Sequence, residues 1–159
     1  MQFKRGTQGV SIVEIVIGAS IMGLLVIASV SALALFVRSA TDSKEQIIAL
    51  YLAEAGVEYM KHIRSVNWDN ISSLSTDTTY YFAVSTTTLA TSTSPEVIDG
   101  YYERSLHLTD LYRDNTGDIV SSTTPGATID TEAFYLTVEV GYGSSSVALS
   151  SIMTNINDE

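Results

Sequence analysis

The sequence predicts an α+β protein in which a long N-terminal α-helix, membrane-spanning in its first half, packs on a small antiparallel β-sheet head. Three observations support this fold class: an uncharged apolar run, an amphipathic stretch directly after it, and alternating apolar residues further on. A length of 159 residues suits one domain, or one domain with an appendage. The expected division is a leader at 1–9, a spanning helix at 10–37, its amphipathic continuation at 38–68, and a β-rich head with Ser/Thr-rich loops at 69–159.

Composition argues against several functional classes. The 8 basic and 18 acidic residues give a net charge of -10, which disfavours nucleic-acid binding because phosphate contacts need Lys and Arg. The chain has no Cys, so disulfides, Cys-based zinc sites and thiol catalysis are excluded. His62 and His107 lack a ligand-like spacing, and no phosphate-binding Gly loop is present. We therefore expect neither enzymatic activity nor a cofactor.

The apolar run predicts one membrane-spanning helix. Residues 15–37 carry no charge, and a helix of that length spans about 35 Å, enough to cross a hydrocarbon core of about 30 Å. Lys4 and Arg5 precede the run, so the N-terminus is expected in the cytoplasm and everything after Arg38 outside the membrane. A secretory signal peptide ending near Ala34 and a plain single-pass anchor are the alternatives.

One carboxylate, Glu14, stands at the start of this apolar segment. At mid-bilayer an Asp costs about 2.5–3.5 kcal/mol on insertion scales, less near an interface, and we expect Glu to be similar. An acidic residue in a spanning segment is therefore a functional candidate. The alternative is an interfacial Glu whose side chain merely reaches the headgroups.

The residues around Glu14 resemble the N-terminus of the type IV prepilin and pseudopilin family. The string Lys4-Arg5-Gly6-Thr7-Gln8-Gly9 is a short basic leader, and Val10-Ser11-Ile12-Val13-Glu14 opens the apolar helix. In that family a membrane peptidase cuts after the Gly, the new first residue is N-methylated, and the fifth mature residue is Glu. The resemblance implies cleavage between Gly9 and Val10 and N-methylation of Val10. Val10 stands where Phe is most common, and Ser11 where Thr is common.

Cleavage would supply the cation that Glu14 lacks. It exposes an α-amino group on Val10, which is mostly cationic near neutral pH and stays basic when methylated. Because Val10 and Glu14 lie four residues apart, a pair within one helix is open. The resemblance implies instead that the amine of one subunit meets Glu14 of its neighbour and sets the axial stagger. A misplaced neighbour would leave a charge unpaired, so the cost of burial would select the register.

The stretch over 41–68 predicts a continuation of the same helix. Its apolar residues recur at helical spacing, as one face of a helix requires. They are Ile48, Leu52, Ala55, Tyr59, Ile63 and Val66. We expect a nearly continuous helix from about Ser11 to about Val66, packed on the head through this face, with Trp68 as a cap over the core. The octet over 51–58 resembles the same region of minor pilins and pseudopilins.

The remainder predicts an antiparallel sheet. Strands are expected over 79–84, 100–111 and 134–142, where aromatic, β-branched or alternating apolar residues recur. Gly143-Ser144-Ser145 should turn into a last strand over 147–156, which forms a hairpin and resembles the last strand of minor pilins. One face of the sheet should pack on the helix. The Ser/Thr-rich stretches 85–94 and 121–124 are expected to be solvated loops, with O-glycosylation as an alternative.

Three aspartates form the only metal candidate in the head. Asp110, Asp114 and Asp118 lie near Asn115-Thr116-Gly117, and oxygen ligands around a Gly turn can bind Ca²⁺. The spacing is not that of an EF-hand, and acidic turns are common. We therefore expect no metal, and keep these residues as calcium candidates.

Together with these patterns, the resemblance to type IV prepilins implies a structural subunit, minor rather than major, of a type IV pilus-like filament. Its expected partners are other pilin or pseudopilin subunits, the prepilin peptidase and methyltransferase, and an inner-membrane assembly platform. It would first lie in the cytoplasmic membrane as a single-pass protein and then enter an extracellular or periplasmic filament. A pseudopilin of a type II secretion system and a membrane-anchored β-domain that binds a ligand are the alternatives.

Overall fold

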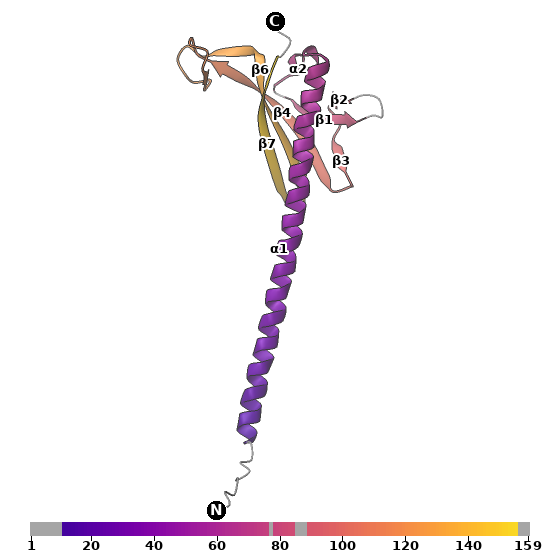
Figure 1. Cartoon of the computed structure of the whole chain (residues 1–159), viewed down its shortest axis with the longest axis vertical. Helices are drawn as coiled ribbons and strands as arrows, with labels where there is room; N and C mark the ends of the chain where they lie inside the picture. Colours follow the sequence, from indigo (N-terminus) through magenta and orange to yellow (C-terminus); the bar gives the residue numbers. More distant parts are fainter. Residues whose placement is uncertain (1–10, 77, 85–88, 156–159) are drawn as a thin grey trace, which may run out of the picture. The chain divides into compact units, whose positions relative to one another are not determined.

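The computed structural model describes residues 11–76, 78–84 and 89–155 (Figure 1). A long helix is followed by a short helix and seven strands, which confirms the α+β class. The elements are α1 Ile12–Val66, α2 Asp69–Ser72, β1 Thr79–Val84, β2 Leu89–Ser92, β3 Glu96–Ile98, β4 Tyr102–Arg113, β5 Ile119–Val120, β6 Thr128–Tyr142 and β7 Ser145–Thr154. The chain divides into two compact units, Met1–Ser43 and Lys44–Glu159, so α1 contributes to both.

The described part of the first unit is one helical segment whose residues are all exposed. Ile15, Val16 and Ile17 have exposed fractions of 60%, 58% and 54%. Because successive helical residues point about 100° apart, these three alone give the helix an apolar surface on every side. A helix that is apolar all round belongs in a protein core or a membrane. This one is long and apolar enough to cross a membrane, with a mean hydropathy of 2.5 in its most apolar window.

The hydroxyl groups within this apolar segment are satisfied by the helix itself. Ser20, Ser29 and Ser31 each donate a hydrogen bond to the carbonyl oxygen four residues earlier, at 2.7–2.9 Å. A hydroxyl without a partner would cost free energy in hydrocarbon, where no water can replace the missing bond. The serines are therefore compatible with a lipid-facing helix.

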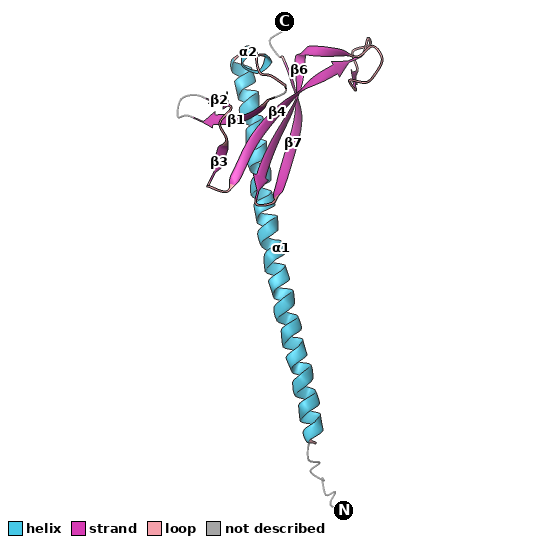
Figure 2. Ribbon diagram, turned by 180° about the vertical axis from the view of Figure 1, so that it is seen from behind, coloured by secondary structure: helices cyan, strands magenta, loops and turns pink. Residues whose placement is uncertain are grey.

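The second unit is built on a seven-stranded sheet whose described pairings are all antiparallel (Figure 2). The strand order is β2-β1-β4-β6-β7, and β3 and β5 pair with β4 beside this path. β4 and β6 form the long central pair, with a register shift between Asp110 and Leu111. β6 and β7 form the expected hairpin around Gly143, whose φ of 56° favours glycine.

The structure confirms the main strands and corrects the loops between them. β1, β4 and β7 lie within about two residues of their expected bounds, whereas β6 begins at Thr128, six residues before its expected start. The expectation of a solvated loop over 85–94 is wrong, because Leu89–Ser92 forms β2 and pairs with β1. Thr and Ser fit the edge of a sheet when a neighbouring strand supplies the ladder, which composition alone does not reveal. Residues 85–88 lie outside the described part of the chain.

The part of α1 in the second unit packs on one face of the sheet. Trp68 caps this core as expected: its side chain is buried and stacks on Phe134 with ring centroids 5.8 Å apart. The helical residues of the core are Ala49, Ala53, Gly56, Val57, Met60 and Ile63. The central strands contribute Leu106, Leu108, Leu136, Val138 and Val140. This confirms the expected packing of helix on sheet.

The buried face of α1 differs from the predicted one by about one residue. Leu52 and Tyr59 are only partly buried and flank the core, and Val66 is 67% exposed. The centre of the contact is the line of Ala49, Ala53 and Gly56. These small side chains carry little apolar signal, so the pattern over larger residues pointed to the flank. Their small size lets the helix axis approach the sheet closely.

Gly56 is the closest point of this approach, and enlarging it is expected to destabilise the head. A Cβ atom at Gly56 would lie 2.7 Å from Val138 Cγ1 and 3.3 Å from Phe82 Cε2. We expect Gly56→Val to lower the free energy of unfolding by about 2–3 kcal/mol, because overpacking outweighs the gain in helix propensity. Denaturant unfolding of the detergent-solubilised chain, followed by Trp68 fluorescence, measures this. Gly23→Val, where a Cβ meets nothing within 4 Å, should leave the midpoint unchanged.

Candidate functional site

Glu14 is the one residue of the expected processing and assembly site that the structure describes. Lys4, Arg5, Gly9 and Val10 lie outside the described residues, so cleavage and methylation remain expectations. Glu14 lies in the first turn of α1, and its N–H donates to the Ser11 carbonyl oxygen at 3.0 Å. A carboxylate is favoured there by the positive end of the helix dipole.

The charged side chain of Glu14 is surrounded by exposed apolar side chains. Its side chain is exposed, and the adjoining Val13 and Ile15 are 63% and 60% exposed. Over residues 11–76, 78–84 and 89–155, none of the ion pairs includes Glu14. Once these apolar neighbours enter hydrocarbon or a helix bundle, the carboxylate needs a cation from elsewhere. A carboxylate placed among apolar side chains in this way is suited to pairing with a cation.

The head contains a buried ion pair that the sequence analysis missed. Arg104 on β4 is 3% exposed and binds Glu96 on β3 with both arms, Nε to Oε2 at 2.9 Å and Nη2 to Oε1 at 2.8 Å. Its Nη1 donates to the carbonyl oxygen of Leu52 on α1 at 3.1 Å. The guanidinium therefore joins two strands to the helix.

Two aromatic rings complete the surroundings of Arg104. Its guanidinium carbon lies 4.9 Å from the ring centroid of Tyr59 on α1 and 4.7 Å from that of Phe82 on β1. Cations at such distances over ring faces are attracted by the ring quadrupoles. The sequence offered one indication that Arg104 faces the core. It lies two residues from both Tyr102 and Leu106, so all three side chains lie on the same, buried face of β4.

The three aspartates do not assemble a metal site. No group of three or more His, Asp or Glu within the described ranges is placed to hold a metal ion. The Asp114 carboxylate instead closes the β4–β5 turn, accepting bonds from Thr116 Oγ1 at 2.6 Å and from the Asp118 N–H at 3.0 Å. The Thr116 hydroxyl, more than any other contact, holds the pKa of Asp114 below its usual value. The carboxylates of Asp114 and Asp118 therefore serve the geometry of the turn.

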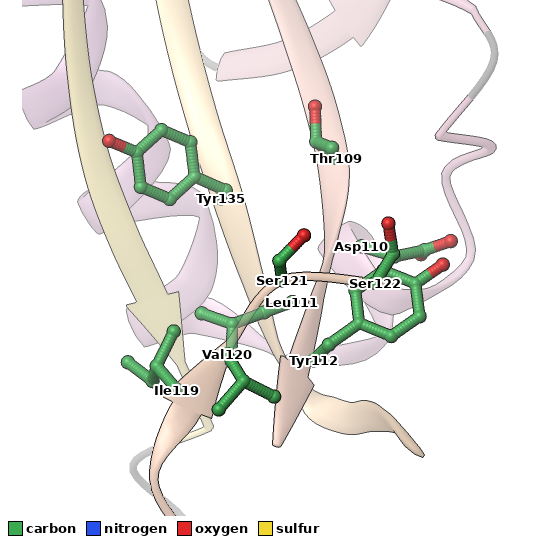
Figure 3. A pocket seen from close by; sticks show the side chains of 9 residues that line it. All are labelled: Thr109, Asp110, Leu111, Tyr112, Ile119, Val120, Ser121, Ser122 and Tyr135. Atoms are coloured by element: carbon green, nitrogen blue, oxygen red, sulfur yellow. The ribbon is translucent and has the colours of Figure 1, made fainter. Parts of the chain in front are cut away.

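A shallow depression of about 270 Å³ lies where β4, β5 and the following turn meet (Figure 3). Its lining combines the Tyr135 ring and the apolar side chains of Leu111 and Val120 with the hydroxyls of Ser121 and Ser122. Asp110 is the single carboxylate in this lining. His62 is exposed on α1, and His107 is half-buried on β4 in register with Thr137. Neither histidine is among the residues that line the depression.

The ion pair of Asp130 and Arg113 makes the head sensitive to acid. Arg113 Nε donates to Asp130 Oδ2 at 2.5 Å, and this bond is the main cause of the lowered pKa of Asp130. Its contribution to stability is therefore complete above the unfolded-state pKa of about 3.9 and is lost as the pH falls below it. We expect Asp130→Asn to destabilise the chain at pH 7 and to destabilise it less near pH 2–3, as measured by urea midpoints. An equal loss at both pH values would contradict this assignment.

Comparison with family models, with curated proteins and with solved structures finds no match for this chain. The class that the structure defines is therefore architectural: a long apolar N-terminal helix whose C-terminal part packs on an antiparallel sheet. This architecture is consistent with that of pilin-like proteins.

Proposed function

We propose that the chain is a structural subunit of a type IV pilus-like filament, with no enzymatic activity of its own. A peptidase removes residues 1–9, Val10 becomes the N-methylated first residue, and α1 joins the core of the assembly. The amine of Val10 on one subunit pairs with Glu14 of its neighbour. The partners are other pilin or pseudopilin subunits, the prepilin peptidase and methyltransferase, and the assembly platform in the inner membrane.

The observation that carries this proposal is the exposed carboxylate of Glu14 in the first turn of a helix that is apolar on every side. A plain membrane anchor gains nothing from a charge at this place, since the charge costs insertion free energy. A subunit whose cleavage creates a cation four residues away uses that charge for alignment. The position of Gly9 supports the same interpretation, because cleavage between Gly9 and Val10 would make Glu14 the fifth residue of the mature chain.

The mass of the chain in its membrane distinguishes this proposal from its alternatives. In a host that carries the peptidase, the chain is expected to begin with N-methylated Val10, and Gly9→Leu should retain residues 1–9. A plain anchored β-domain would begin at Met1, and a signal peptide would be lost up to about Ala34. Intact-mass spectrometry of the membrane fraction reads these outcomes directly. A chain beginning at Met1 despite an active peptidase would contradict the proposal.

A further inference from the structure

Among the described residues, strand β7 forms a long edge of the sheet without the usual protections. It pairs with β6 through ten consecutive residues without interruption, from Ser145↔Tyr142 to Thr154↔Ala133. In Figures 1 and 2 no other described element lies beside its outer edge. Natural edge strands are usually short, charged, bulged, covered or interrupted by Pro. β7 is ten residues long, carries neither charge nor Pro, and has one buried residue, Met153.

The opposite edge of the same sheet is protected by its shortness. β2 has four residues and β3 has three, so neither offers a long ladder of backbone groups. The asymmetry indicates that β7 is adapted to pair with a further strand, since unpaired backbone N–H and C=O groups in a long regular edge are a template for another chain.

We propose that the partner of β7 is β7 of a second copy of this chain, paired antiparallel about a two-fold axis at Ser150. Opposed residues of an antiparallel pair lie on the same face, so only some registers are allowed. In the register centred on Ser150, Val147 meets Met153 on the helix side and Ala148 meets Ile152 on the outer side. Ser150 meets itself, and Ser146 meets Thr154. Apolar residues thus meet apolar ones, and hydroxyls meet hydroxyls, except where Leu149 meets Ser151.

Charge and exposed surface support a second copy as the occupant. No charged side chain lies on β7, so two copies meet without like charges directly opposite each other. Ile152 is 41% exposed and its register partner Tyr135 is 44% exposed, so the pair would cover apolar surface that the single chain leaves in water. The net charge of -10 on each copy opposes association at long range, and salt screens this repulsion.

The pairing would join heads that point in opposite directions. The Tyr101 hydroxyl lies beside Gly143, before β7, and donates to Glu45, while Thr154 at the end of β7 accepts a hydrogen bond from Arg64. β7 therefore runs in the same direction as this part of α1. In an antiparallel β7–β7 pair, the corresponding parts of the two α1 helices would then run in opposite directions. The inference does not depend on the proposed function, because the pairing involves residues of the second unit alone.

Single cysteines test the register, because the chain has none of its own. Ser150→Cys places two thiols opposite each other across the two-fold axis, within reach of a disulfide or a short bis-maleimide. Ser146→Cys is a matched control on the same strand and face, but its two copies would lie about 27 Å apart. We expect covalent dimers of the detergent-solubilised full chain from Ser150→Cys, at least tenfold more than from Ser146→Cys, and more of them at higher salt.

The outcomes separate this inference from the proposed function, because cross-linking does not depend on removal of residues 1–9. Equal cross-linking of the two variants would overturn the register. A monomeric Ser150→Cys chain in concentrated solution would overturn the pairing itself. In a second measurement on the chain without cysteine, Ser150→Lys should abolish the dimer seen by sedimentation, and Thr137→Lys on the neighbouring strand β6 should not. Dimers that persist in Ser150→Lys would also count against the proposal.

Discussion

Replacing Glu14 with Gln is expected to abolish entry of the chain into filaments and to leave its membrane insertion intact. In the assembled state the amine of Val10 would lose its partner among apolar side chains. Removing one member of a buried ion pair costs about 3–5 kcal/mol, which corresponds to a loss of incorporation of more than about 100-fold. Comparing the chain in sheared surface material with the chain in the membrane fraction measures this loss.

Glu54→Gln is the matched control for Glu14→Gln. Glu54 is exposed on the same helix, in the part of α1 that belongs to the head, and its removal changes the net charge by the same amount. It should incorporate normally. Chains carrying Glu14→Gln that polymerise as well as those carrying Glu54→Gln would show that the charge at Glu14 has no role in assembly.

Replacing Glu96 with Gln is expected to destabilise the head strongly. It leaves the guanidinium of Arg104 buried between Tyr59 and Phe82, with the Leu52 carbonyl and a neutral amide in place of a carboxylate. The expected loss in free energy of unfolding is about 3–5 kcal/mol. Denaturant titration followed by Trp68 fluorescence measures it, since this single Trp is buried in the same core.

Two further variants identify the cause of that loss. Glu103→Gln removes an exposed carboxylate from the adjoining position on β4 and should change stability little. The double variant Glu96→Leu/Arg104→Met removes both charges and should be more stable than Glu96→Gln alone, because no unpaired ion remains buried. A double variant less stable than Glu96→Gln would show that the ion pair itself, and not the stranded charge, stabilises the head.

The elements with a strong periodic signal were predictable, and those that depend on partners were not. The spanning helix was predictable from the length of its apolar run, and β4 and most of β6 were predictable from their alternation. β2 and β5 have four and two residues, and they exist because β1 and β4 offer them a ladder. The predicted face of α1 was off by about one residue. The helix contacts the sheet through Ala49, Ala53 and Gly56, whose small side chains carry little apolar signal in the sequence.

The candidate sites divide in the same way. Glu14 was conspicuous because a charge at the edge of an apolar run is rare, and that needs no partner to be recognised. Arg104 was hidden because its role depends on Glu96 and on a carbonyl of α1, which lies 52 residues earlier in the chain. The aspartates near Thr116 suggested a metal, but the turn uses the Asp114 carboxylate itself, which local hydrogen bonding explains.

A density map of the assembled filament would test the proposed pairing between subunits most directly, because it gives the distance between the Val10 nitrogen and the nearest Glu14 carboxylate. We expect the chain to begin at Val10, with this nitrogen within about 4 Å of Glu14 of a neighbouring subunit. A filament in which residues 1–9 remain attached, or in which Glu14 meets no cation of a neighbour, would contradict the account.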